Sequence, residues 1–175
     1  MKKSEIVEIF SRFQEKKENP VIELNYTTPY ELLVAVILSA QATDKGVNRV
    51  TPTLFEKANT PEKMVKHGLD NLKESVKSIG LFNTKSANII KMSQLLIDQF
   101  DSVVPDNLKD LMSLPGVGRK SANVMLNSIY GKHTIAVDTH VFRVSNRIGF
   151  CKTTTVEATE EALMRIVPKQ FLDRA

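Results

Sequence analysis

The chain has 175 residues, with 24 Lys or Arg against 20 Asp or Glu, a formal net charge of +4 and 42% hydrophobic residues. This apolar content is enough to fill a core and excludes a disordered chain. No apolar run reaches the ~18–20 residues that a membrane helix needs, and a single cysteine excludes an internal disulfide framework. The composition predicts a soluble protein of a reducing compartment. Cys151 and three scattered histidines predict no metal site.

Helical periodicity accounts for almost the whole sequence. Ile6, Ile9, Phe10 and Phe13 mark one face of a first helix. Capping residues and helix breakers then predict further helices over 29–38, from 43 onward, over 61–68, 69–80 and 84–100, around 108–111, and over 119–130, 139–148 and 156–167. Pro52 is expected to kink or split the helix that begins at 43. Residues 134–137 alternate weakly and are too short to found a sheet. The prediction is an all-α fold.

Basic residues gather in one part of the chain. Between Asp110 and Glu157 there are six Lys or Arg and a single acid, Asp138, whereas residues 1–104 carry 14 bases and 13 acids. Such a sector is typical of a polyanion binder, because Lys and Arg displace counterions from phosphates. An ordinary solvated face is the alternative. A carboxylate inside a phosphate-binding sector weakens binding unless it has another role.

A short repeat brings glycines into that sector. Lys85-Ser86-Ala87-Asn88 recurs as Lys120-Ser121-Ala122-Asn123, which suggests one helix–turn–helix device used twice. Only the second copy follows two glycines, Gly116 and Gly118, just ahead of a helix N-terminus. Backbone N–H groups there can bind a phosphate that no side chain obstructs. The alternative is a tight interhelical turn, and the position within the basic sector favours the phosphate.

Four motifs in order carry a family resemblance. Leu111-x-x-Leu114-Pro115-Gly116-Val117-Gly118 resembles the helix-hairpin-helix motif, and 137–143 follows it. With 38–44 and 79–85, the sequence resembles the endonuclease III branch of the helix-hairpin-helix DNA glycosylase superfamily from about residue 24 to residue 168. The resemblance implies a two-domain fold, with residues 22–132 in one domain, its hairpin at about 108–130, and residues 1–21 plus 133–175 in the other.

The sequence departs from that family in one respect. Family members usually carry a C-terminal segment of four cysteines that holds a [4Fe-4S] cluster, and this chain has no such segment. No cluster is therefore expected to be ligated by these residues. We expect the second domain to be incomplete at its C-terminus, with the chain either a fragment or a naturally short form.

The resemblance also implies an activity in base-excision DNA repair. It implies a bifunctional glycosylase that removes oxidised pyrimidines from duplex DNA and cleaves the abasic site by β-elimination through a lysine Schiff base. Lys120 is then the nucleophile, and Asp138 stabilises the oxocarbenium-like sugar. The neighbouring Arg119 and the helix N-terminus disfavour the charged amine, whereas DNA phosphates favour it. By their positions alone, Lys120 could be a phosphate contact and Asp138 a helix N-cap, and Asp138 can serve in both roles.

The remaining expected site residues contact DNA or support those that do. By resemblance, Gln41 enters the gap left by the flipped base and Leu81 wedges the opposite strand. The alternatives are a helix-flanking Gln41 and a core Leu81. Further DNA contacts are expected from Gly116, Val117, Gly118, Arg119 and Arg143, with Thr139 and His140 in support. The expected partner is double-stranded DNA with a damaged base or abasic site, bound by a monomer in a bacterial cytoplasm. A helix-hairpin-helix DNA-binding module without turnover is the alternative function.

Overall fold

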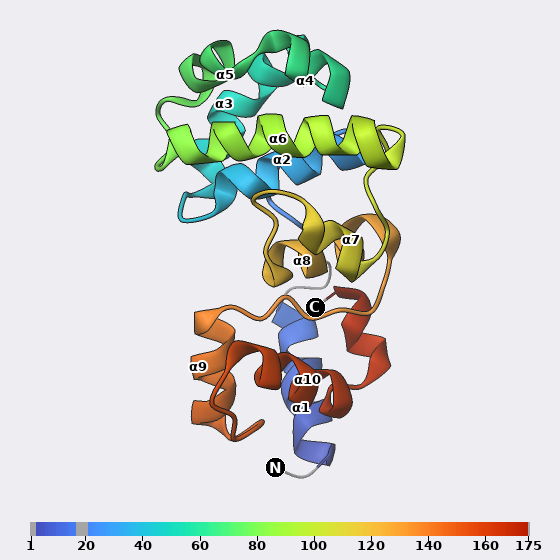
Figure 1. Cartoon of the computed structure of the whole chain (residues 1–175). Helices are drawn as coiled ribbons and strands as arrows, with labels where there is room; N and C mark the ends of the chain where they lie inside the picture. Colours follow the sequence, from blue (N-terminus) through green and yellow to red (C-terminus); the bar gives the residue numbers. More distant parts are fainter. Residues whose placement is uncertain (1–2, 17–20, 175) are drawn as a thin grey trace. The chain divides into compact units, whose positions relative to one another are not determined.

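The computed structural model describes residues 3–16 and 21–174. Within these ranges the chain consists of helices and their connections, without a strand, which confirms the all-α prediction (Figure 1). Residues 134–137 are an irregular connection. None of the helices in this part of the chain is both long and apolar enough to span a membrane.

The chain divides into two compact units. The central unit comprises residues 23–125, and the terminal unit comprises residues 1–22 and 126–175. This division falls within one helix, ahead of the boundary after residue 132, which stays a prediction. Asn127 explains the difference, since its side-chain amide donates to the backbone carbonyls of Thr134 and, at 2.9 Å, Leu172.

The central unit is built around a buried helix. It contains α2 (Pro29–Ser39), α3 (Asp44–Lys57), α4 (Pro61–His67), α5 (Leu69–Val76), α6 (Phe82–Phe100), α7 (Leu108–Ser113) and the first part of α8 (Arg119–Tyr130). Every residue of α2 from Tyr30 to Leu38 is buried. In Figure 1, α6 lies alongside α2 and beneath α4 and α5, and contacts join these pairs. A helix that is apolar all round belongs in such a core.

The start of α2 follows from its sequence. Thr28 accepts the backbone N–H of Glu31, and Pro29 takes the first helical position, where its missing N–H costs nothing. The Glu31 carboxylate departs from a standard capping box. It accepts from the backbone N–H of Thr27 at 2.7 Å and from the Thr27 hydroxyl, one residue before the cap.

Two helix predictions need correction. Pro52 lies inside α3, so the expected split is absent, because buried Val47, Thr51 and Leu54 hold the helix against its neighbours on both sides of the proline. A kink at Pro52 stays a prediction. Tertiary packing of an apolar face outweighs local propensity here. Helix α6 begins at Phe82, two residues before the predicted start, since Leu81 takes a left-handed conformation and serves as its N-cap residue.

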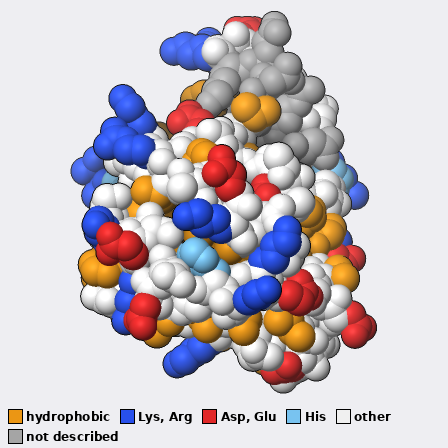
Figure 2. Space-filling view, turned by 90° about the horizontal axis from the view of Figure 1, so that it is seen from above, with side chains coloured by type: hydrophobic (Ala, Val, Ile, Leu, Met, Phe, Trp, Pro, Cys, Tyr) orange, Lys and Arg blue, Asp and Glu red, His pale blue; other side chains and the backbone are white. Residues whose placement is uncertain are grey.

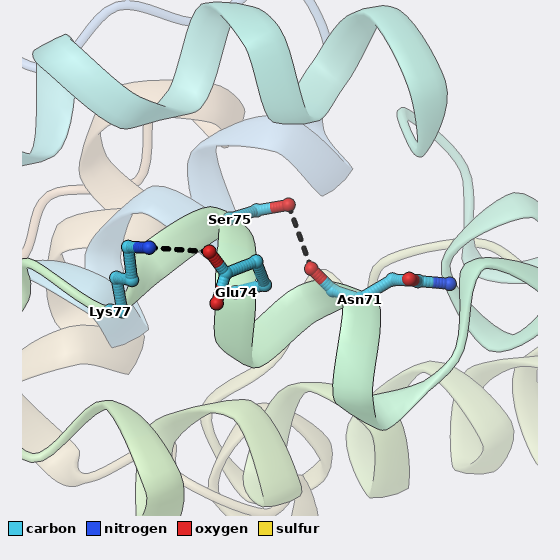
Figure 3. A network of polar contacts seen from close by, with 4 residues as sticks. All are labelled: Asn71, Glu74, Ser75 and Lys77. Atoms are coloured by element: carbon cyan, nitrogen blue, oxygen red, sulfur yellow. Dashed lines mark hydrogen bonds and ion pairs between the residues drawn. The ribbon is translucent and has the colours of Figure 1, made fainter.

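Local polar contacts lie on the exposed surface of α5. Ser75 Oγ donates to the carbonyl of Asn71 at 2.8 Å, and Lys77 forms an ion pair with Glu74 (Figure 3). Figure 2 shows the end of the molecule toward which α4 and α5 lie, with basic and acidic side chains interspersed. Exposed pairs of this kind contribute little to stability. This face matches the balanced charge of residues 1–104.

The terminal unit brings both ends of the chain together. It contains α1 (Lys3–Lys16), α9 (Thr139–Ile148), α10 (Val156–Ile166) and the 3₁₀ helix η1 (Lys169–Arg174). Its buried core consists of Ile135, Val137, Leu163, Val167, Phe171 and Leu172. The ring of Phe10 in α1 stacks on Phe150 and Phe171 at centroid distances of 5.7 and 5.5 Å. Aromatic stacking therefore joins the first helix to the C-terminal segment.

Candidate functional site

Gln41 occupies the connection between α2 and α3. Its backbone is left-handed, with φ of +57°, and its side chain is exposed. The connection is well ordered at both ends, because Ala42 N–H donates to Ser39 and Thr43 Oγ1 caps α3 by accepting from Gly46. A non-glycine residue held at positive φ costs roughly 1–2 kcal/mol. Such strain persists at functional sites when the surroundings enforce it.

Leu81 has the same unusual conformation in a second loop. Its φ is +59°, and its side chain is 62% exposed, so the alternative of a core leucine is excluded. The preceding Gly80 faces the first loop, since a Cβ built on it would lie 4.0 Å from the Gln41 carbonyl oxygen. Two strained, exposed residues that were predicted to act on DNA therefore project from adjacent loops.

Lys85 lies beneath these loops. The residue is only 6% exposed, and its Nζ donates to the carbonyl of Leu38 at 2.9 Å. Burial lowers the pKa of Lys85. A lysine that binds a phosphate of DNA would have an exposed amine. The buried Lys85 does not fit that role. Sequence reasoning missed this bond because its partner lies 47 residues away.

The hairpin between α7 and α8 has two different glycines. Gly116 has φ of +83°, and a Cβ added there would come within 3.0 Å of Asn88 Cβ and 3.4 Å of Ile37 Cγ2. This glycine is required by the fold. Gly118 has no positive φ, and an added Cβ would meet nothing within 4 Å. Gly118 therefore leaves open space at the start of α8.

Val117 lies inside the hairpin, and its contact with DNA stays a prediction. Its side chain is buried, and its backbone N–H donates to the Leu114 carbonyl at 3.1 Å. This bond closes the hairpin turn, so Val117 supports the loop from inside. Gly118 accepts the N–H of Ala122 at 2.9 Å and so begins the helix, with half-buried Arg119 next to it.

Lys120 is the second residue of α8 and is exposed. It follows directly on the hairpin, so the central unit brings together four predicted elements: Gln41, Leu81, the hairpin and Lys120. An exposed amine at a helix N-terminus lies near the partial positive charge of the helix dipole. The arrangement can hold an anion at the backbone while the amine reacts beside it.

Asp138 belongs to the terminal unit and caps α9. One carboxylate oxygen, Oδ1, accepts the backbone N–H groups of His140 and Val141, both at 2.9 Å. The capping alternative is therefore present in the structure, and it leaves a catalytic role open, since these cap bonds engage only one of the two carboxylate oxygens. The pairing of Asp138 with Lys120 stays a prediction.

The other predicted residues of the terminal unit lie on α9. Arg143 Nη2 donates to His140 Nδ1 at 3.1 Å, and both side chains are exposed. Thr139 is also exposed, at the first position of the helix. Thr139, His140 and Arg143 thus form an exposed polar edge beside the Asp138 cap.

The residues present do not fit an iron–sulfur cluster. Four thiolates are needed, whereas the chain has one cysteine, Cys151, which is half-buried with its Sγ 3.7 Å from Thr153 Oγ1. In the described ranges, no group of three or more His, Cys, Asp or Glu could hold a metal ion. No step of the chemistry is derived through such a group.

The central unit also has a surface depression that does not involve the predicted site residues. It has a volume of about 360 Å³ and is lined by Thr28, Pro29, Tyr30, Asn59, Thr60, Pro61, Glu62, Ser102, Val103 and Val104. It lies at the start of α2, whereas Gln41 follows the end of that helix. None of the predicted site residues lines it.

An all-α fold with a double-glycine hairpin leading to an exposed lysine defines the class of helix-hairpin-helix DNA repair proteins. Residues 34–169 match the HhH-GPD superfamily of base excision DNA repair proteins. The chain is 52% identical over 171 residues to endonuclease III of Haemophilus influenzae and 48% identical to endonuclease III of Escherichia coli K12, covering 98% of this chain and 81% of each relative. The chain belongs to the endonuclease III family.

Solved structures agree with this assignment. A trapped endonuclease III–DNA covalent intermediate superposes with a TM-score of 0.93 at 43% identity, covering 99% of this chain and 82% of the other. A non-covalent endonuclease III–DNA complex gives 0.92, also at 43% identity, with 99% and 81% covered. A thermostable thymine-DNA glycosylase gives 0.82 at 22% identity, covering 98% and 83%, and shows the common fold.

Proposed function

We propose that this chain is a bifunctional DNA glycosylase and abasic-site lyase that removes oxidised pyrimidines from double-stranded DNA. The observation that carries the proposal is the exposed Lys120, which directly follows Arg119 and lies two residues after Gly118 of the hairpin, at the start of α8. Family membership supports the reaction class, and the related structures include endonuclease III bound covalently to DNA. The chain acts as a monomer on DNA in a bacterial cytoplasm.

In this mechanism the Lys120 amine attacks C1′ of the damaged nucleotide. The base leaves with the electrons of the glycosidic bond, and opening of the sugar ring gives an iminium with Lys120. Loss of a C2′ proton then expels the 3′ phosphate. The carboxylate of Asp138 stabilises positive charge on the sugar as the base departs. Its Oδ1 is engaged by the α9 cap, which fixes the orientation of the carboxylate.

DNA binding and base extrusion use the other loops. Gly118 lets a phosphate approach the start of α8, where the helix dipole favours negative charge, and Gly116 allows the turn that places it there. Arg119 and Arg143 add positive charge on α8 and α9. Gln41 fills the space of the extruded base, and Leu81 enters the opposite strand as an apolar wedge. The exposure of an apolar side chain on a strained backbone supports that role for Leu81.

Borohydride trapping tests this function. An iminium between lysine and an abasic site is reduced to a stable amine, so native protein and abasic duplex should yield a covalent adduct. Lys120→Ala should abolish the adduct and lower strand cleavage by at least about 10³-fold, the scale on which loss of a nucleophile acts. Lys91→Ala removes an exposed lysine from α6 and should retain the adduct.

The alternative function gives a different result. A helix-hairpin-helix module without turnover would bind the abasic duplex and form no adduct even as the native protein. An adduct that persists at full yield in Lys120→Ala would assign the chemistry to another amine.

A further inference from the structure

Lys85 joins the two loops that carry Gln41 and Leu81. Leu38, whose carbonyl accepts from Lys85 Nζ at 2.9 Å, precedes Gln41 by three residues. Leu81, whose carbonyl accepts the backbone N–H of Lys85 at 3.0 Å, precedes Lys85 by four. One residue therefore bonds to the base of both loops, through its side chain on one side and its backbone on the other.

The side-chain bond meets a need of α2. The last carbonyls of a helix have no partner within the helix, and a cation or donor near them is favourable. At the end of α2, Val36 accepts from the Ser39 hydroxyl, Ser39 accepts from the N–H of Ala42, and Leu38 accepts from Lys85. Lys85 thus caps one of the last carbonyls of α2 from another helix.

Stability alone is a poor reason for this arrangement. Moving a lysine amine out of water is costly, and an apolar side chain in a buried site is often as stable or more stable. What an apolar residue cannot do is fix the position of the Leu38 carbonyl relative to α6. The lysine therefore provides a defined geometry between two loops at a cost in desolvation.

The same end of α6 also contacts the hairpin. Asn88, one turn after Lys85, lies against Gly116, where an added Cβ would approach Asn88 Cβ to 3.0 Å. The first two turns of α6 therefore contact all three loops that the proposed function assigns to DNA. Among these contacts, the Lys85 side-chain bond joins α6 to the end of α2, directly ahead of the Gln41 loop.

We propose that Lys85 is a positioning residue for base extrusion, holding the Gln41 and Leu81 loops at a fixed separation so that one fills the vacated space while the other wedges the opposite strand. This inference rests on the proposed function. Two side chains that act on opposite strands of one base pair must stay at a fixed distance from each other. If the residues that hold them in place are removed, the site loses its productive geometry.

Lys85→Met tests the proposal, since it keeps an unbranched stem of similar length and removes the donor. The matched control is Lys91→Met, an exposed lysine on the same helix. Single-turnover excision is measured on thymine glycol in a fully paired duplex and on the same lesion opposite an abasic analogue. The second substrate has no base pair to break.

With Lys85→Met, excision from the paired lesion should fall by about tenfold to 10²-fold, as expected when reacting groups are misplaced by about an ångström. Excision from the unpaired lesion, the borohydride adduct with an abasic site, and affinity for intact duplex should change little. Lys91→Met should behave as the native protein on both substrates. If excision falls equally on both substrates, Lys85 supports only the fold. If excision is unchanged on both, the Lys85 bond is dispensable.

A second variant and a second readout keep the test decisive. Lys85→Gln retains a donor with a shorter reach, so it should give the same pattern at smaller size if Lys85→Met does not fold. Binding to a duplex with 2-aminopurine opposite a non-hydrolysable abasic site should raise fluorescence for the native protein, and less so for the variants. This readout does not need turnover, so a native chain that unstacks 2-aminopurine without excision would overturn the proposed function and leave the positioning role supported. Unchanged fluorescence in both variants would overturn the positioning role.

Discussion

Two helices of the central unit begin near the same four residues, and they turn different sides of that sequence toward the core. In α6, Lys85 and Ser86 are buried, whereas in α8 the corresponding Lys120 is exposed and Ala122 and Asn123 are buried. The lysine is the fourth residue of α6 and the second of α8. Two positions rotate a side chain by about 200° around a helix axis.

The difference shows that the place of a motif within its helix decides its role. Leu81 begins α6 with a left-handed backbone, and Lys85 on that helix packs inward against the end of α2, where the Leu38 carbonyl accepts from its Nζ. Gly118 begins α8 immediately before Arg119, which leaves Lys120 outward. The buried lysine is suited to hold loops in place, and the exposed one to react. Both copies of the repeat lie near the start of a helix that follows a turn, and the environment of the lysine differs between the two.

The largest effect is expected for a change at Asp138, which tests whether the exposed Lys120 can react without that carboxylate. Asp138→Asn leaves Lys120 untouched and keeps an oxygen that caps α9, so the melting temperature should change little. It removes a negative charge that stabilises the developing sugar cation, so single-turnover base excision should fall by about 10²–10⁴-fold. Affinity for a non-hydrolysable abasic duplex should hold or rise. Unchanged excision with a large drop in melting temperature would make Asp138 a cap only.

A smaller effect tests the glycine that precedes the exposed lysine. Gly118→Val should fold normally, because an added Cβ meets nothing within 4 Å. It should obstruct a phosphate and weaken binding to intact and damaged duplexes alike, by about 0.5–1.5 kcal/mol for one hydrogen bond. Gly116→Ala is the comparison variant, since positive φ and the contact with Asn88 should destabilise it. Unaltered duplex affinity and salt dependence in Gly118→Val would make the hairpin a turn only.

The smallest effect concerns the buried lysine and pH. Burial lowers the pKa of Lys85 below the ordinary 10.5, so between the two values the unfolded chain binds more protons than the folded one. The free energy of unfolding therefore gains a contribution that rises with pH in that window. Lys85→Met lacks it, so native stability relative to the variant should improve as pH rises toward 10.5. Urea unfolding at several alkaline pH values measures this, and parallel curves would contradict it.

Local signals in the sequence predicted much of the fold. The bounds of α8 and α9 match the predicted 119–130 and 139–148, because a glycine follows each helix and Asp138 caps the second. The start of α6 was not predictable in the same way. No local rule favours leucine in a left-handed conformation, so Thr84 had the stronger capping signal.

For the candidate site, too, some features were predictable from the sequence and others depend on the folded structure. Motif order assigned Lys120, Gln41 and Leu81 to the site, and their exposure in the structure is compatible with that assignment. The burial of Lys85 and Val117 depends on partners in the folded protein. For Lys85 that partner is a backbone carbonyl, which has no signature in sequence. Conversely, the strain at Gln41 is a property of the backbone that side-chain identity does not reveal.

In the proposed function, the left-handed backbones of Gln41 and Leu81 have a consequence for how the protein would search DNA. Each left-handed backbone costs the folded protein roughly 1–2 kcal/mol. A protein that inspects a duplex pair by pair would otherwise have to rearrange these loops at every step. With the loops already in place, each inspection is limited by how readily the base pair opens, and damaged pairs open most readily. The conformational work is completed once, during folding, and is not repeated along the genome.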